Sequence, residues 1–146
     1  VGDGAAAVIL ASADRAKQLH DRPAWITGFA HRVDSPGLSL RDLTTSPSTV
    51  AAAAAAGASR PFDVAELHAP FTHQEILLTR ELGLDDGVVV NPSGGVLSGN
   101  PMFAAGLARI GAAAQAVMTS RANRVLAHAT SGPALQQNLV CVMEAR

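Results

Sequence analysis

Five histidines and a single cysteine are the side chains of this 146-residue chain that could carry acid–base or nucleophilic chemistry near neutral pH. His68 ends a run of β-forming residues, where its imidazole could act as a general base. The alternative is a histidine at a strand end that bonds only to backbone. The five histidines lack metal-ligand spacing, so the sequence predicts no metal site.

The lone Cys141 lies among Leu139, Val140 and Val142 in a predicted terminal strand. That setting favours a buried structural thiol over a nucleophile. A single cysteine can form neither an internal disulfide nor a cysteine-based metal cluster.

A glycine-rich loop over 91–95 is followed by a second group of candidate residues. Gly94 and Gly95 could let backbone approach a ligand, or could form an ordinary turn. Asn100 precedes Pro101, where asparagine commonly caps a helix. Its amide could instead donate a hydrogen bond to an oxyanion. Both roles coexist only if the side chain keeps a free donor.

The elements that must position these residues alternate along the chain. We expect strands over 5–11, 24–33, 62–68, 88–90, 124–130 and 138–144, and helices over about 13–20, 46–57, 72–82 and from Asn100 and Pro101 onward. The order βαβαβαβαββ predicts an α/β domain with a mixed sheet between helix layers.

Local patterns define the helices in more detail. Ser12 and Ser46 are expected as N-caps, and Thr72 with Glu75 as a capping box. In the last helix, apolar residues at spacings of four and three predict one buried face, formed by Phe103, Leu107, Ile110, Ala114 and Val117.

Composition limits the class of protein. With 48% hydrophobic and 16% charged residues, residues 1–146 suit one globular domain. The net charge is −1 and no basic run occurs, which argues against nucleic-acid binding. No stretch is long and apolar enough to span a bilayer, and no signal peptide opens the chain, so we expect a cytoplasmic protein.

Several short motifs together resemble one family. They are DGAAAV at 3–8, ELHAPF at 66–71, NPSGG at 91–95 with Asn100, Pro101, Ala105 and Gly106, and QQNL at 136–139. In this order and spacing they resemble the C-terminal half of a thiolase-superfamily protein of the sterol-carrier (non-specific lipid-transfer) type. The resemblance implies a five-layered α-β-α-β-α architecture, of which this chain supplies one of two similar halves.

The resemblance also implies where the site lies and what it has lost. Gly99, Asn100 and Pro101 stand at the family's Gly-His-Pro motif, and Pro70 stands at its proton-transferring cysteine. An asparagine amide can donate a hydrogen bond but cannot accept a proton near neutral pH. The expected catalytic residues are His68 and Asn100, and the expected substrate-binding residues are Gly94, Gly95, Ser98 and Gly99.

The implied function is acyl-CoA processing by an acyltransferase of lipid or sterol side-chain metabolism, or retro-aldol carbon–carbon cleavage of an acyl-CoA. A coenzyme A thioester would be the substrate or ligand, with no covalently bound cofactor. Implied partners are an N-terminal half with the nucleophilic cysteine, a second copy in a thiolase-type dimer, and a small OB-fold protein. The alternatives are a non-catalytic acyl-CoA or lipid carrier, a structural subunit, or a piece of a full-length thiolase.

Overall fold

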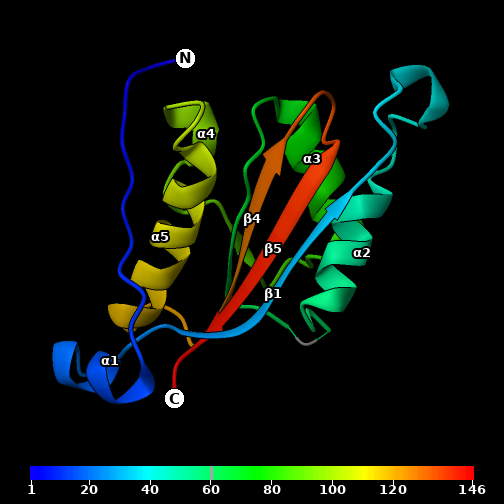
Figure 1. The fold of residues 1–146 in the computed structure, drawn as a ribbon. Helices are drawn as coiled ribbons and strands as arrows, with labels where there is room; N and C mark the ends of the chain where they lie inside the picture. The colour runs from blue at the N-terminus through cyan, green and yellow to red at the C-terminus, as the bar shows by residue number, and fades with distance from the viewer. Residues whose placement is uncertain (60) are drawn as a thin grey trace.

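The computed structural model describes residues 1–59 and 61–146 as a layered α/β domain (Figure 1). Its helices are α1 (Ala13–Leu19), α2 (Pro47–Ala55), α3 (Thr72–Glu81), α4 (Gly95–Ser98) and α5 (Ala105–Met118), with a 3-10 turn η1 at Leu38–Leu40. Its strands are β1 (Trp25–Val33), β2 (Val64–Glu66), β3 (Val89–Val90), β4 (Arg124–Ser131) and β5 (Gln137–Glu144).

The five strands form one mixed sheet in the order β1-β5-β4-β2-β3. Strand β2 pairs in parallel with both β3 and β4, whereas β5 runs antiparallel to β4 and to β1. The carboxyl ends of β2, β3 and β4 therefore meet at one edge of the sheet. In open α/β sheets, ligand sites form at this edge.

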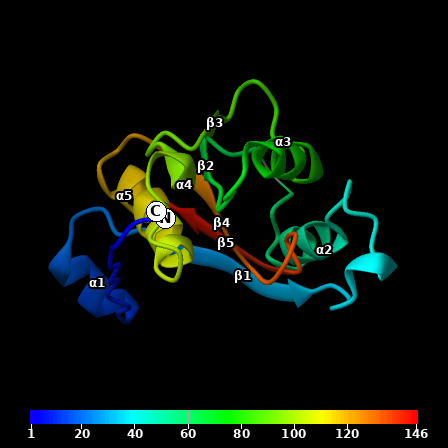
Figure 2. The same ribbon diagram turned by 90° about the horizontal axis from the view of Figure 1, so that it is seen from above.

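The sheet is covered on both faces, which confirms the predicted α/β class with a mixed sheet between helices. Viewed from above, α5 lies on one face, and α2 and α3 lie on the other (Figure 2). Because side chains alternate along a strand, Leu126 and Val140 pack toward α2 and α3, whereas Val125 and Cys141 pack toward α5.

The first predicted strand is wrong. Residues 5–11 form no strand, and the segment runs along the outside of α5 (Figure 1). Gly2 donates its backbone N–H to the carbonyl of Asn100 at 3.0 Å, but no ladder of backbone bonds joins 5–11 to a described strand. Ile9 is 88% exposed and Leu10 is 77% exposed. An apolar run becomes a strand only where a neighbouring strand supplies partners for its backbone.

The last helix also differs from expectation. Helix α5 begins at Ala105, with Ala104 as its N-cap, rather than at Pro101. Phe103 is fully exposed at 101% and Leu107 lies at 36%. The predicted apolar face is therefore wrong at Phe103 and Leu107, whereas Val117 is buried and Ile110 and Ala114 pack, half-buried, against the core beneath the helix. The face against the sheet is built mainly from small residues that let the helix approach closely. The buried positions of α5 are Ala105, Arg109, Ala113, Ala116 and Val117.

The predicted capping box is wrong as well. Helix α3 takes Phe71 as its N-cap, and no side chain caps its first turn. The carboxylate of Glu75 instead accepts a hydrogen bond from Nδ2 of Asn91 at 2.5 Å. Ser12 and Ser46 do occupy N-cap positions, yet neither side chain bonds to the helix backbone. For Glu75, the hydrogen bond with Asn91 has replaced the expected bond to the backbone of its own helix.

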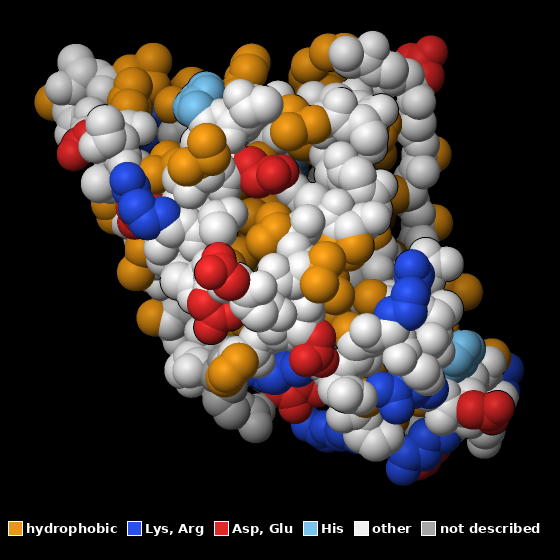
Figure 3. Space-filling model, turned by 180° about the vertical axis from the view of Figure 1, so that it is seen from behind, with side chains coloured by type: hydrophobic (Ala, Val, Ile, Leu, Met, Phe, Trp, Pro, Cys, Tyr) orange, Lys and Arg blue, Asp and Glu red, His pale blue; other side chains and the backbone are white. Residues whose placement is uncertain are grey.

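Charged and apolar groups share the outer surface. Lys and Arg side chains gather with acidic ones at the end of the molecule that carries α1, away from α4 (Figure 3). Apolar side chains are spread over much of the remaining face (Figure 3). Within the described part of the chain, every helix is too short or too polar to cross a membrane.

Candidate active site

Two polar side chains, one at the end of β2 and one just beyond it, face helix α5. Glu66 ends β2 and His68 follows two residues later, so the alternation of the strand places both on the same side of the sheet. Gly106 and Arg109 are three residues apart on α5 and therefore share a helix face. A Cβ added to Gly106 would lie 3.7 Å from Nδ1 of His68 and 2.9 Å from Cβ of Ala129. The glycine thus permits the close approach of α5.

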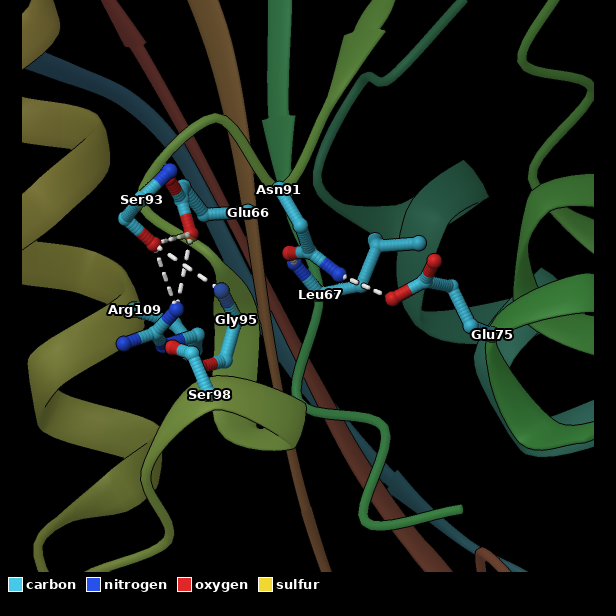
Figure 4. Close-up of polar contacts among 8 residues, drawn as sticks. All are labelled: Glu66, Leu67, Glu75, Asn91, Ser93, Gly95, Ser98 and Arg109. Carbon is cyan, nitrogen blue, oxygen red and sulfur yellow. Dashed lines mark hydrogen bonds and ion pairs between the residues drawn. The ribbon is translucent and has the colours of Figure 1, made fainter. Parts of the chain in front are cut away.

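Glu66 and Arg109 form a buried ion pair beneath the glycine-rich loop. Nη1 of Arg109 donates to Oε2 of Glu66 at 3.0 Å and to Oγ of Ser93 at 2.6 Å. Ser93 donates its backbone N–H to Oε1 of Glu66 at 3.1 Å and its hydroxyl to Oε2 at 2.7 Å. Figure 4 shows all three side chains converging. The ion pair therefore holds one end of the loop.

The other end of the loop is held by Asn91. Its Oδ1 accepts the backbone N–H of Leu67 at 2.6 Å, and its Nδ2 donates to Glu75 of α3 (Figure 4). Asn91 adopts φ +49°, a left-handed conformation that asparagine tolerates better than most residues. The loop thus connects β2, β3 and α3 at the carboxyl edge of the sheet.

The predicted substrate-binding residues lie close together in the chain, where Gly94, Ser98 and Gly99 are exposed and Gly95 is buried. Gly94 has φ +90° and leads into α4, and a Cβ there would lie 2.6 Å from Oγ of Ser98. The Ser98 hydroxyl donates to the Gly95 carbonyl at 3.0 Å, and the Gly95 N–H donates to Oγ of Ser93 at 3.3 Å. Gly99 has nothing within 4 Å of an added Cβ. The sequence's turn interpretation of Gly94 is confirmed, and open space lies beside Gly99.

His68 is buried, with 6% of its surface exposed. Its Nδ1 accepts the backbone N–H of Thr130 at 3.3 Å. In the neutral ring this bond selects the tautomer with the proton on Nε2. Nε2 makes no hydrogen bond to the described residues, so its proton is left for another acceptor. This geometry makes His68 a hydrogen-bond donor.

Its electrostatic setting also favours the neutral ring. Burial, and then the positive charge of Arg109, hold the pKa of His68 below its usual value. A neutral imidazole that donates through Nε2–H can stabilise a developing oxyanion without first losing a proton. The bond to Thr130 is also the backbone bond that the alternative interpretation of His68 predicts.

Asn100 lies between α4 and α5 and caps neither helix, so the expectation of an N-cap is wrong. The turn over 101–104 separates it from the first residue of α5, and Ala104 occupies the N-cap position. Its Oδ1 is buried without a partner. Asn100 is half-buried, and its Nδ2 makes no hydrogen bond to the described residues, so the amide keeps a free donor.

The structure brings some predicted residues together and leaves others apart. Gly94, Gly95 and Ser98 share the loop and α4, whereas no hydrogen bond joins His68 to Asn100 in the described residues. A cavity of 520 Å³ lies instead between residues 1–6 and the start of α5, lined in part by Pro101, Phe103 and Leu107. Within the described ranges, no group of His, Cys, Asp and Glu could hold a metal ion.

Cys141 and Pro70, which the sequence also raised as positions of interest, lie where neither can carry out acid–base chemistry. Burial raises the pKa of the Cys141 thiol to about 11, which confirms a buried thiol. Pro70, half-buried after β2, offers no ionisable group. Sequence reasoning missed Glu66 and Arg109. A charged residue in each of two segments expected to be buried was the available signal, since such charges are nearly always paired.

A second buried histidine lies on the opposite face of the sheet. His128 of β4 is fully buried and bonds through Nε2 to Oδ1 of Asn138 at 2.9 Å. Asn138 donates to Oγ of Ser48 at 2.7 Å and to the carbonyl of Leu135 at 2.7 Å, so its Oδ1 is the acceptor and His128 is the donor. Nδ1 of His128 is buried without a partner. Burial lowers the pKa of His128 to about 4, against a smaller opposite effect from Asn138.

Comparisons with known proteins identify relatives. No protein-family model matches the chain. It is 32% identical over 133 residues to an acetyl-CoA acetyltransferase of Methanothermobacter thermautotrophicus. The aligned region covers 75% of this chain and 35% of that protein. It is 36% identical over 116 residues to a β-ketoadipyl-CoA thiolase of Pseudomonas putida and 37% identical over 113 residues to one of Pseudomonas knackmussii. Each of these covers 73% of this chain and 27% of the relative.

The chain thus spans about a third or less of the length of the curated relatives it matches. The similarity nevertheless extends over about three quarters of the chain, and all three relatives are thiolases or acetyltransferases of acetyl-CoA by name. The layered α/β fold with its mixed sheet is consistent with these relatives. The chain is therefore related to the thiolase superfamily.

Proposed function

We propose that this chain is the C-terminal part of a thiolase-like protein that processes a coenzyme A thioester in lipid or sterol side-chain metabolism. One observation carries the proposal: in a chain related to thiolases, Thr130 fixes His68 at the carboxyl edge of the sheet and leaves its Nε2–H without an acceptor among the described residues. A donor in that place suits the carbonyl oxygen of a thioester.

The face of α5 that turns away from the sheet supports a missing N-terminal half. Leu107 is exposed on this face, and Met102 and Phe103 are exposed in the turn before the helix. Val8, Ile9 and Leu10 are exposed in the segment that runs along the outside of α5 (Figure 1). Exposed apolar surface of this kind marks an interaction site. We therefore propose that an N-terminal thiolase half, in the same polypeptide or in another, packs on this face and brings the nucleophilic cysteine. A thiolase-type dimer would follow from the same architecture.

The chemistry left to this chain is stabilisation of negative charge rather than proton removal. His68 would donate through Nε2–H, and Asn100 through Nδ2, to a thioester oxygen. Pro70 carries no proton, and the carboxylate of Glu66 is bonded to Arg109 and Ser93. A retro-aldol cleavage needs one base and one oxyanion site, and we propose that the base comes from outside this segment. No covalently bound cofactor is needed.

The test uses the complete protein, with and without a small OB-fold partner. Purified enzyme is incubated with β-hydroxyacyl-CoA and β-ketoacyl-CoA, and chromatography follows the shorter acyl-CoA. Loss of one oxyanion donor lowers kcat by about 10²–10³-fold, which is the decrease expected for His68→Ala. His31→Ala, which alters an exposed histidine on β1, should leave the rate unchanged. No cleavage or acyl transfer by the unaltered protein would refute catalysis.

His68→Gln separates the two roles that the sequence left open. Glutamine retains an N–H donor but cannot act as a base near neutral pH. If His68 donates, this variant keeps more activity than His68→Ala. If His68 is the base, both variants are equally inactive, and the donor assignment fails.

The second candidate function is binding of an acyl-CoA or lipid without catalysis. Asn100 and Pro70, which stand where the thiolase resemblance expects a histidine and a cysteine, favour it. This alternative predicts saturable binding of acyl-CoA by calorimetry without turnover. It also predicts that His68→Ala and Asn100→Ala leave the affinity unchanged.

A further inference from the structure

The loop at 93–95 is exposed at Ser93 and Gly94, yet the groups that hold it are buried beneath it. Glu66 is 1% exposed and Arg109 is 8% exposed. A single nitrogen, Nη1 of Arg109, bonds to both Glu66 and Ser93. The conformation of a surface loop therefore depends on a charge pair that water hardly reaches.

We propose that Arg109 is a positioning residue for this site: through Ser93 and Glu66 it fixes the loop, and from α5 it places a guanidinium on the side of the sheet that His68 faces. The importance of this arrangement for an acyl-CoA rests on the proposed function. The two structural claims, about the loop and about the charge state of His68, do not depend on turnover.

The claim about His68 follows from two packed elements. Glu66 and His68 lie on one face of the β2 segment, and Gly106 and Arg109 lie on the facing side of α5. The described titratable groups near His68 are Glu66 on its own segment, Arg109 from α5 and His128 from β4. Burial lowers the pKa of His68 most, and of these groups Arg109 lowers it further. A protonated His68 would place a second cation beside the guanidinium.

The claim about the loop follows from a chain of hydrogen bonds. The Ser93 hydroxyl donates to Glu66, and its oxygen accepts from both Arg109 and the Gly95 N–H. Gly95 adopts φ +60° at the first position of α4. The direction of that N–H therefore depends on Ser93, and the position of Ser93 depends on the buried pair. Hydrogen bonds to charged groups are stronger than those between neutral groups, so the bonds of Ser93 to Glu66 and Arg109 are suited to holding an exposed loop in place.

The charge arm of the test is a titration of the histidine ring by NMR in the complete protein. In Arg109→Gln the pKa of His68 should rise, because the cation is removed and Glu66 remains. Arg109→Lys keeps the charge and should restore a value near that of the unaltered protein. Arg121→Gln, at an exposed arginine beyond the other end of α5, should change nothing. An unchanged pKa in Arg109→Gln would overturn the charge claim.

A second variant covers failure of Arg109→Gln to fold. In the double variant Glu66→Gln with Arg109→Gln, the two amides can bond to each other and no lone charge is buried. A smaller rise in the pKa of His68 is expected there, since the cation is again absent but the carboxylate of Glu66 is absent as well. Its absence in that variant counts against the claim equally.

The claim about the loop is tested with Ser93→Ala. This variant removes the hydroxyl that bonds to Glu66, Arg109 and the Gly95 N–H, and it leaves the ion pair between Glu66 and Arg109. Exchange of the Gly95 amide hydrogen should become roughly fivefold faster, the factor for loss of one ordinary hydrogen bond. The pKa of His68 should stay constant, because Arg109 is retained. Unchanged exchange at Gly95 would overturn the loop claim.

These results are distinguishable from failure of the proposed function. Both arms are measured without substrate. If the complete protein neither binds nor turns over acyl-CoA while both arms give the expected shifts, the proposed function fails and the positioning role stands. If acyl-CoA is processed but neither arm shifts, the reverse holds.

Discussion

The buried His128 predicts a specific loss of stability in mild acid. In the native chain its ring is neutral, donates through Nε2 to Asn138 and leaves Nδ1 without a hydrogen-bond donor. Protonation would add a charge and a second N–H donor in a place without solvent. The native pKa is about 4, against 6.5 for the ordinary side chain. The unfolded chain therefore binds this proton at a higher pH than the native chain does.

The sign and size follow from linkage. Above about pH 6.5 both states are neutral at this site, and His128 costs nothing. Between that pH and about 4 the unfolded state is protonated and the native state is not, so unfolding becomes easier by about 1.4 kcal/mol for each unit of pH. The full loss is about 3 kcal/mol, and it stops growing once the native ring is also protonated.

The assay is urea unfolding of the complete protein from pH 8 to pH 4, for the unaltered protein and for His128→Gln. Glutamine can still donate to Asn138 but does not titrate. The difference in unfolding free energy between the two proteins should change by about 3 kcal/mol over this range, with the variant gaining relative stability in acid. The exposed variant His31→Gln is the control and should follow the unaltered protein.

Parallel curves for the unaltered protein and His128→Gln would refute the reasoning. They would mean that His128 is either already charged in the native state or able to find a partner for Nδ1. Carboxylates and His68 are common to both proteins, so their titration cancels in the comparison.

Three further predictions concern the core and the site. Glu66→Ala should cost about 3–5 kcal/mol in urea unfolding, because Arg109 is left buried and unpaired, and Glu66→Gln should cost less; equal losses would contradict this. Gly106→Ala should lower the melting temperature and alter the NMR signal of His68, since the new methyl would lie 2.9 Å from Cβ of Ala129; an unchanged melting temperature would refute the tight packing. Cys141 should resist a thiol reagent at pH 8 until urea unfolds the protein, because burial raises its pKa to about 11; rapid native labelling would contradict this.

Local sequence patterns predicted much of the framework. Strands near 24–33, 124–130 and 138–144 and the alternation of helices and strands are confirmed, because runs of β-forming residues and helix periodicity are properties of the chain itself. The buried thiol of Cys141 is confirmed for the same reason, since its apolar neighbours in sequence are also its surroundings in the strand.

Features that depend on contacts between distant segments of the chain could be read only from the tertiary structure. Residues 5–11 have strand composition but no described strand to pair with, and α5 buries alanines rather than Phe103 because close packing on the sheet requires small side chains. Glu75 bonds to Asn91 instead of its own helix. Pairing across 43 residues, as between Glu66 and Arg109, leaves no periodic trace.

For the site, the sequence determined which chemical groups are present: one imidazole after a strand, one amide before Pro101 and a pair of glycines in a loop. Only the tertiary structure decided the protonation pattern and direction of those groups. A backbone N–H from β4 selects the tautomer of His68, and a turn after Asn100 removes it from the helix end. Hydrogen-bond donors and acceptors act over about 3 Å, and the partners within that distance come from segments far apart in the chain.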